Sequence, residues 1–488
     1  MSLPCGKRIP ASEHAVSLSL PTLRDVIGYE EKSAAVLQHV CSGYPRFVRH
    51  WTVARVQSLL QARFGCKGPV VALHEVAACS RLMAFLDQDL QVLDGLPFGA
   101  VELPAGDDAL MSEVQRFLQH TGLMLSSRQA EDVLIESGVT EAPQPEARFE
   151  GGNPGAAVRQ ALAGLYGVSG ERVGLYPSGM NAYFSVFDSL DRQQRRLGHE
   201  QWLQVGWLYL DTTAILDRFA RRKHLQFPVA AVDAIEAYIA QHHDQIAGIT
   251  TEVMTNPLLQ TPDLARLGTL ARRFNLPLIV DLSMPTPVNV EVFPHADVVI
   301  ESLTKFASGH ADVMGGAAIF NPGTEWGRRL RETVPDGAPY RRDLQRLAHS
   351  IGGYAQRMAR INDNATALVD YFRSCRRVKT VHWAGQPDSE NHYNALRRPA
   401  GGNGGVVSVV FEKPLETVYD RLDLRKGPSF GTVFTLCMPY VYMAHYDMIT
   451  TSAGRKRLKH EGIDPELLRI SVGTEPIDDL IRAFESAS

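Results

Sequence analysis

Cysteine is scarce in this sequence, and the few cysteines are scattered. Six are spread over 488 residues, with no Cys-x-x-Cys pair and no cysteine–histidine spacing that suits zinc. We therefore expect reduced, structurally incidental thiols, with neither a disulfide scaffold nor a metal site.

Long apolar runs and an excess of one charge are missing as well. No run approaches the ~20 apolar residues that span a bilayer, and Met1–Pro10 lacks the apolar core of a signal peptide. The 50 Lys and Arg nearly balance the 54 Asp and Glu, for a net charge of −4. We expect a cytoplasmic protein that binds neither membranes nor nucleic acid.

Three regions of the chain differ in pattern. Helical periodicity prevails at first, as in Thr52–Phe64, and the Pro- and Gly-rich stretch Glu141–Gly155 reads as a linker. We expect an N-terminal, mostly helical segment (1–145), a large α/β domain (146–325) and a smaller C-terminal α+β domain (326–488).

Short apolar runs alternate with helical segments between Val173 and Asn321, a rhythm typical of a mainly parallel sheet covered by helices on both faces. A helix is expected at Asp263–Phe274, a long helix near Leu344–Cys375 and a later strand at Gly405–Glu412. The predicted strands of the sheet are Val173–Tyr176, Trp202–Tyr209, Ile246–Val253, Leu276–Asp281, Ala296–Ser302 and Ala317–Asn321.

Two consecutive predicted strands deliver a carboxylate and an amine to one edge of the sheet. The first strand ends in Asp281, and the next continues directly into Lys305. This pair suits a pyridine-ring cofactor, because the amine forms an imine with an aldehyde while the carboxylate keeps the ring nitrogen protonated. Taken singly, each has a common alternative: a solvated surface lysine, or a carboxylate that caps a helix or binds a metal.

A phosphate site is predicted beside this pair. Gly179 and Met180 open a helix, where free backbone N–H groups and the helix dipole favour an anion. Ser302 and Thr304 add hydroxyls from the strand end. Near Glu252, which ends another predicted strand, the rigid turn at Asn256-Pro257 would place an amide over the cofactor or substrate.

These residues and their order resemble the Cys/Met-metabolism family of pyridoxal-5′-phosphate (PLP) enzymes. The likeness runs from about Gly152 to Glu475, and its most specific part is SLTKFASGHADVMGG, residues 302–316. Within the family, the sequence most resembles the fungal type of cystathionine γ-synthase. The segments that carry this resemblance are HAVSLSLPTLRDVIGYEE, GYPRFVRH and GPSFGTVFTLCMPYVYMAHY. The resemblance implies PLP fold type I, with a mainly parallel seven-stranded sheet and a smaller C-terminal α+β domain.

The resemblance also implies roles for individual residues. Lys305 would carry PLP as a Schiff base and shuttle protons, Asp281 would pair with the ring nitrogen, and Tyr209 would stack on the ring and assist proton transfer. Gly179, Met180, Ser302 and Thr304 would hold the phosphate, Asn256 would touch the ring oxygen or substrate, Arg469 would bind the substrate carboxylate, and Ser429 would contact the substrate.

Two positions depart from the family pattern. Family members usually carry a Tyr-x-Arg pair before the Gly-Asn-Pro turn, which reaches the neighbouring subunit's phosphate site, but Arg148-Phe149-Glu150 stands there. Arg148 is the candidate substitute charge, and Gly43–Phe47 a candidate cover for a neighbour's site. Phe434 replaces a glutamate that often follows the Ser429 loop.

The implied reaction is γ-replacement: an O-acyl-homoserine loses its acyl group and a thiol such as cysteine adds, giving cystathionine or a related thioether. The alternatives are a γ-elimination lyase, γ-replacement with another nucleophile in specialised metabolism, and a non-catalytic protein that kept the fold. Small amino acids are the expected substrates, and the family implies a homodimer or homotetramer.

Overall fold

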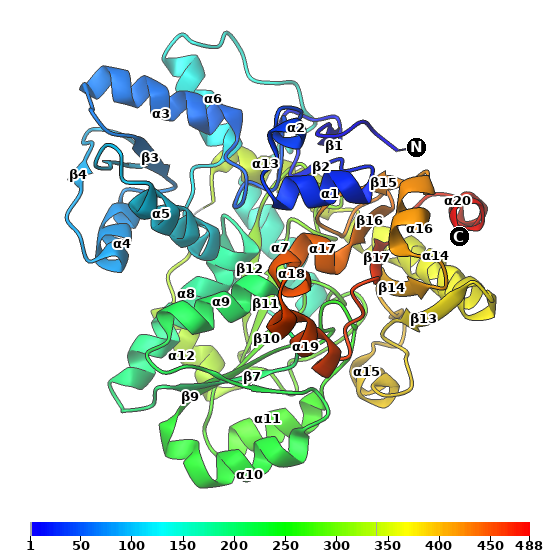
Figure 1. Cartoon of the computed structure of the whole chain (residues 1–488). Helices are drawn as coiled ribbons and strands as arrows, with labels where there is room; N and C mark the ends of the chain where they lie inside the picture. The colour runs from blue at the N-terminus through cyan, green and yellow to red at the C-terminus, as the bar shows by residue number, and fades with distance from the viewer. Residues whose placement is uncertain (1, 338) are drawn as a thin grey trace.

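A seven-stranded sheet lies at the centre of the structure, a computed structural model that describes residues 2–337 and 339–488 (Figure 1). The strand order is β6-β12-β11-β10-β9-β7-β8, and β12 alone runs antiparallel to its neighbours. This confirms the predicted mainly parallel sheet. Its strands are β6 (Val173–Tyr176), β7 (Gln201–Val205), β8 (Leu225–Phe227), β9 (Ile246–Glu252), β10 (Leu278–Asp281), β11 (Val298–Ser302) and β12 (Gly316–Phe320).

Helices cover both faces of this sheet, and alternate residues of each strand pack against opposite layers. On β10, Ile279 joins one apolar cluster while Leu278 and Val280 join the other. Asp281 alternates in step with Ile279 on β10, and Ser302 with Val298 and Ile300 on β11, so both strand-end side chains lie on the same face as α8. One layer holds α7 (Pro154–Tyr166), α10 (Val232–His242), α11 (Leu264–Arg273) and α13 (Arg341–Ile351); the other holds α8 (Gly179–Arg195), α9 (Leu210–Phe219) and α12 (Glu325–Thr333).

The C-terminal part contains a second sheet of order β13-β14-β17-β16-β15. The single long helix predicted near Leu344–Cys375 is wrong: α13 ends at Ile351 and α14 (Tyr354–Ser374) follows, because Gly352 and Gly353 favour a break. The other elements are β13 (Val378–His382), α15 (Glu390–Leu396), β14 (Val406–Phe411), α16 (Leu415–Arg421), β15 (Arg425–Lys426), β16 (Leu436–Pro439), α17 (Tyr440–Ala444), α18 (Tyr446–Thr450), α19 (Ser452–His460), β17 (Leu468–Ser471) and α20 (Ile477–Ala487).

The N-terminal residues pack in two places. Residues 18–36 share an apolar core with the C-terminal sheet, whereas residues 53–134 build cores of their own around the sheet β3-β5-β4. The elements are β1 (Arg8–Ile9), β2 (Ser17–Leu18), α1 (Leu23–Glu30), α2 (Ala34–Leu37), α3 (Trp51–Phe64), β3 (Val70–Leu73), α4 (Ala77–Leu86), β4 (Gln91–Val92), β5 (Gly99–Glu102), α5 (Asp108–Thr121) and α6 (Ser127–Glu136).

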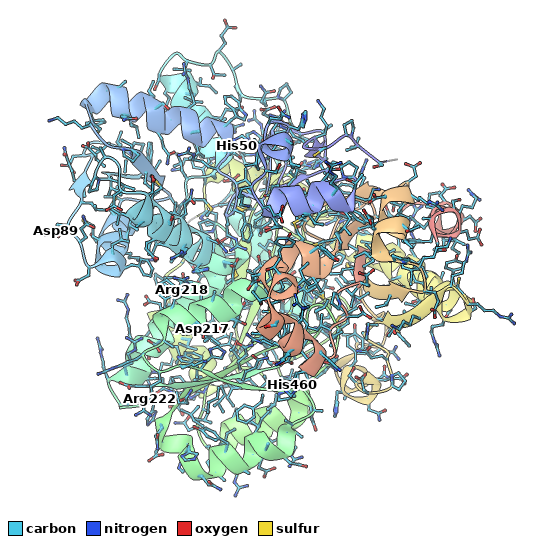
Figure 2. The ribbon with its side chains drawn as sticks, in the orientation of Figure 1. His50, Asp89, Asp217, Arg218, Arg222 and His460 are labelled. Carbon is cyan, nitrogen blue, oxygen red and sulfur yellow. The ribbon has the colours of Figure 1, made fainter. Side chains whose placement is uncertain are left out.

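The segment between α2 and α3 connects these two parts. His50, labelled in Figure 2, caps α3 by accepting the backbone N–H of Thr52 on its ring, and its other ring nitrogen contacts the carbonyl of Glu13 at 2.9 Å. At the other end of the segment, Ser42 Oγ donates to the carbonyl of Ala15 at 2.7 Å, so both ends are anchored. Among residues 2–337 and 339–488, no helix has the length and apolarity to cross a bilayer.

Candidate active site

A cavity of about 740 Å³ lies at the carboxyl ends of β9, β10 and β11, with walls from all three parts of the chain. The last residues of these strands, Glu252, Asp281 and Ser302, line it. This is where ligands bind in open parallel sheets. The cavity is lined by nine of the predicted site residues: Gly179, Met180, Tyr209, Asn256, Asp281, Ser302, Lys305, Ser429 and Arg469.

Lys305 presents a buried amine to this cavity. Its Nζ donates a 2.7 Å hydrogen bond to Ser429 Oγ and lies 4.6 Å and 5.0 Å from the ring centroids of Tyr44 and Phe430. Burial lowers the pKa of Lys305 to about 8, an effect that the positive charge of Arg469 reinforces and Tyr44 opposes. A substantial fraction of the amine is therefore neutral near neutral pH, as a nucleophile or a base requires.

Asp281 and Glu252 form a buried carboxyl pair on neighbouring strands, in direct register. Burial raises the pKa of Asp281 to about 6, while the backbone N–H of Ser283, at 2.8 Å, stabilises the anion. Burial, together with the charge of Asp281, raises the pKa of Glu252 well above its ordinary range. Because two adjacent buried carboxyls do not both ionise readily, Asp281 is the anion and Glu252 the neutral acid.

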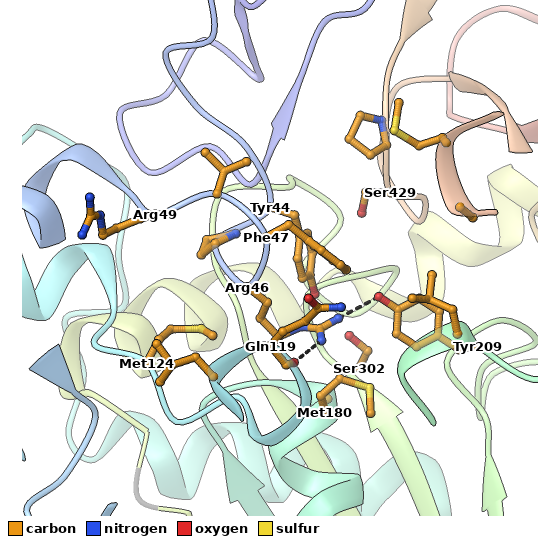
Figure 3. Close-up of a pocket in the computed structure, with 18 of the residues that line it drawn as sticks. Tyr44, Arg46, Phe47, Arg49, Gln119, Met124, Met180, Tyr209, Ser302 and Ser429 are labelled. Carbon is orange, nitrogen blue, oxygen red and sulfur yellow. Dashed lines mark hydrogen bonds between the residues drawn. The ribbon is translucent and has the colours of Figure 1, made fainter. Parts of the chain in front are cut away.

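Arg46 enters the site from the N-terminal part of the same chain (Figure 3). It donates to the Tyr209 hydroxyl at 2.7 Å, to Asp211 Oδ2 at 2.5 Å and to the backbone carbonyl of Gln119 at 2.6 Å. The guanidinium is buried, so these contacts fix both its own position and that of the Tyr209 ring. We call residues 44–47 the Tyr44–Phe47 loop.

The two tyrosines of the site differ in acidity. Burial raises the pKa of Tyr209 well above its ordinary value, despite the nearby charge of Arg46. Burial acts in the same direction on Tyr44, but the cations Lys305 and Arg46 outweigh it and lower the pKa of Tyr44. Tyr44 is thus the more acidic of the two tyrosines and the one beside Lys305.

Arg469 forms the cationic end of the cavity. Its guanidinium donates to Asn256 Oδ1 at 3.1 Å and to the backbone carbonyl of Ser429 at 2.8 Å, and it lies 5.3 Å from the ring centroid of Phe430. Burial lowers the pKa of Arg469 to about 10, so the charge persists at neutral pH. A buried guanidinium without a carboxylate partner in the described residues suits an incoming carboxylate.

Two candidates from the sequence lie elsewhere. Thr304 is buried but outside the cavity lining, with its hydroxyl bonded to the backbone N–H and carbonyl of Gly315 at 3.1 Å and 3.3 Å. Arg148 is exposed and also outside the lining. Arg46 belongs to Gly43–Phe47, the segment predicted to cover a neighbour's site, and in the structure it lines the cavity of its own chain. Tyr44-Pro45-Arg46 has the Tyr-x-Arg spacing that was expected just before Gly152.

Comparison with known proteins places these residues in a family context. Residues 149–488 match the model of the Cys/Met metabolism PLP-dependent enzymes. The chain is 38% identical over 98% of its length to an L-2-amino-4-chloropent-4-enoate dechlorinase/desaturase of Streptantibioticus cattleyicolor, of which 97% is covered. It is 32% identical to a cystathionine γ-synthase of Neurospora crassa over 80% of this chain and 64% of that protein.

A solved structure shares the fold. Cystathionine γ-lyase from Lactobacillus plantarum, complexed with L-serine, superposes with a TM-score of 0.57 at 23% identity, over 69% of this chain and 87% of that one. At this identity the likeness concerns the fold alone.

The cavity residues fit a PLP molecule. It would need an amine for its aldehyde, an anion for its ring nitrogen and donors for its phosphate. Lys305 and Asp281 supply the first two, and the first turn of α8 and Ser302 supply donors. Arg46 Nε is a further one: it is buried and lacks a hydrogen-bond partner among the described residues. That leftover donor suits an anionic group.

Replacing Arg46 with lysine tests its part in cofactor binding. Lysine can keep the charge opposite Asp211 but cannot also hold the Tyr209 hydroxyl and offer a further donor. We expect the apoenzyme's affinity for PLP to fall about tenfold or more, as the loss of a charge-assisted hydrogen bond implies. Titrating apoenzyme with PLP and following protein fluorescence measures this. The matched control is Arg148→Lys, and equal affinities in both variants would contradict the assignment.

Proposed function

Because the chain belongs to the Cys/Met metabolism family of PLP-dependent enzymes, we propose that it expels a leaving group from the γ carbon of an α-amino acid and adds a thiol in its place. With an O-acyl-homoserine and cysteine, the product is cystathionine. One observation carries the proposal: Lys305, Asp281 and Arg469 line a single cavity, so an amine, a buried anion and a carboxylate receptor act on one molecule.

The cofactor and the amino acid would be held by different walls. Lys305 and Asp281 would hold the two ends of the PLP ring, and Gly179, Met180, Ser302 and Arg46 its phosphate. When bound, PLP supplies an electron sink that makes the Cα and Cβ protons of the substrate acidic. Arg469 would bind the substrate carboxylate, and the carbonyl of Ser429 and the amide of Asn256 keep that guanidinium in place.

The proton transfers fall to Lys305 and its neighbours. Freed by the substrate amine, Lys305 Nζ removes the Cα proton. Because Nζ is then an ammonium group, the Cβ proton needs a second acceptor, and its loss lets the γ substituent leave with its electron pair. The lowered pKa of Lys305, about 8, suits a base that must also return a proton. Tyr44, whose ring lies 4.6 Å from Nζ, takes up or returns the second proton.

Elimination is the second candidate, and the relative from Streptantibioticus cattleyicolor favours it. Its name describes a substrate with chlorine on C4, which is the γ carbon, and it matches nearly the whole chain. The first steps are common to both reactions. They diverge only when a thiol adds at Cγ, or when no thiol is held and the amino-acid skeleton is released unsaturated or as a 2-oxo acid with ammonia.

Product analysis separates the two reactions. Purified holoenzyme is offered O-acetyl- and O-succinyl-homoserine, cystathionine, methionine and 2-amino-4-chloropent-4-enoate, each with and without cysteine or sulfide. We expect a homoserine ester to be converted to a thioether, and only when the thiol is present. If ammonia, a 2-oxo acid or chloride is released at the same rate with and without the thiol, the reaction is elimination. If no γ-substituted amino acid is consumed, both reactions are refuted.

A further inference from the structure

Glu30 is a carboxyl group that lines the active-site cavity and has no hydrogen-bond or salt-bridge partner among the described residues. It is the last residue of α1 and lines the same cavity as Lys305. Its side chain is only partly exposed, yet among residues 2–337 and 339–488 it receives no hydrogen bond and forms no ion pair. Removing a carboxylate from water without a partner costs free energy, and a cation that binds to it offsets that cost.

Other ionisable groups that line the cavity have hydrogen-bond partners, which distinguishes Glu30 from them. Lys32, its nearest cation in sequence, turns back on α1: Nζ donates to the carbonyl of Tyr29 and lies 4.8 Å from that ring centroid. The engaged groups and their partners are Arg46 with Asp211, Arg469 with Asn256, Asp281 with the N–H of Ser283, Glu252 with the N–H of Tyr209, and Lys305 with Ser429.

The helix that carries Glu30 is firmly fixed. Thr22 and Asp25 form a capping box at its start, and the N–H of Leu23 donates to Asp420 Oδ1 at 2.8 Å. At its end, the hydroxyl of Tyr446 donates to Glu31 at 2.5 Å. The Glu30 carboxyl is therefore presented at a defined place. Burial raises the pKa of Glu30 to about 7, with Lys32 acting in the opposite direction, so an arriving cation would stabilise the anion.

We propose that Glu30 binds the primary ammonium group of the second substrate, an amino-acid thiol. This inference rests on the replacement reaction proposed above. The first substrate has its own partners, because Arg469 takes its carboxylate and its amine is used at the cofactor beside Lys305. The thiol must approach Cγ from the rest of the cavity, whose wall includes Tyr29, Glu30 and residues of α17. A carboxylate there selects a thiol that carries an ammonium group.

The test compares two thiols that differ in this group: cysteine and 3-mercaptopropionate, which lacks the amine. Steady-state kinetics of PLP-loaded wild type and Glu30→Gln are measured with a saturating homoserine ester. We expect the ratio of the KM for cysteine to the KM for 3-mercaptopropionate to rise about tenfold or more in Glu30→Gln, the usual effect of losing a charge-assisted contact. The KM for the ester stays within twofold. Glu31→Gln, which removes the adjacent exposed carboxylate, is the matched control and leaves the ratio unchanged.

Each outcome has a distinct meaning. An unchanged ratio in Glu30→Gln, on an enzyme that still makes thioether, overturns the inference alone. An equal rise in both KM values, or the same rise in Glu31→Gln, also overturns it, because the effect would then be structural or due to net charge. A wild-type enzyme that makes no thioether from any ester overturns the replacement reaction and the inference together.

Discussion

Replacing Lys305 with alanine abolishes covalent cofactor capture and lowers turnover by about 10⁴-fold, the upper range for losing a positioned general base. In the proposed mechanism the buried amine both attacks the PLP aldehyde and moves the Cα proton, and it lines the cavity beside Ser429. Borohydride reduction followed by peptide mass spectrometry reports the first loss, since the adduct on the Lys305 peptide disappears. Turnover of the γ-substituted amino acid reports the second.

An exposed lysine provides the control for that experiment. Lys379 lies on the surface 3.8 Å from Asp464, and Lys379→Ala keeps both the adduct and the turnover. The acidity of Lys305 adds a pH test: with a pKa of about 8, its neutral fraction grows from pH 7 to pH 9. The rate of PLP capture by wild-type apoenzyme therefore rises over that range. A flat rate, or turnover by Lys305→Ala at the parent's rate, removes the basis of the proposed mechanism.

Asp281→Asn is expected to lower turnover by roughly 10³-fold while the cofactor stays attached to Lys305. The substitution keeps the size of the side chain but removes the anion that would hold the ring nitrogen protonated. Breaking a buried ion pair costs ~3–5 kcal/mol, and ~4 kcal/mol corresponds to about three decades in rate. Single-turnover kinetics of Cα deprotonation, with the substrate deuterated at Cα, measure the step that depends on this charge.

The neighbouring carboxyl group, Glu252, provides the control for Asp281→Asn. Glu252 is the neutral partner of the pair, so Glu252→Gln exchanges one uncharged group for another of similar shape. We expect it to lose less than about tenfold in the same assay. If Glu252→Gln were as damaging as Asp281→Asn, the assignment of the charge to Asp281 would be wrong.

The strand ends of the large domain were the part of the site that the sequence predicted well. Asp281 and Ser302 end their strands as expected, and Lys305 follows Ser302 by three residues. A buried parallel strand is a largely apolar run, and Asp281 is the first polar residue after such a run. Tyr209 and Arg469 came from the family resemblance, whereas Asn256 was also predicted from the turn it forms with Pro257, and all three lie in the same cavity. Their roles remain predictions.

Short and distant features escaped the sequence reasoning. β8 has three residues, Leu225–Phe227, and the strands of the N-terminal sheet have two to four, too few to show a period. The contact of Arg46 with Tyr209 joins positions 163 residues apart, which no local pattern reports. The buried charged groups of this site have partners that are distant in the sequence, so those partners can be identified only from the three-dimensional structure.

The Tyr44–Phe47 loop and Lys305 belong to one polypeptide, and this has a genetic consequence. A defect in the loop and a defect at position 305 damage the same centre, so a cell carrying one copy of each defective gene holds no intact centre. We therefore expect a mixture of the two defective proteins to stay inactive. The two lesions therefore fail to complement each other.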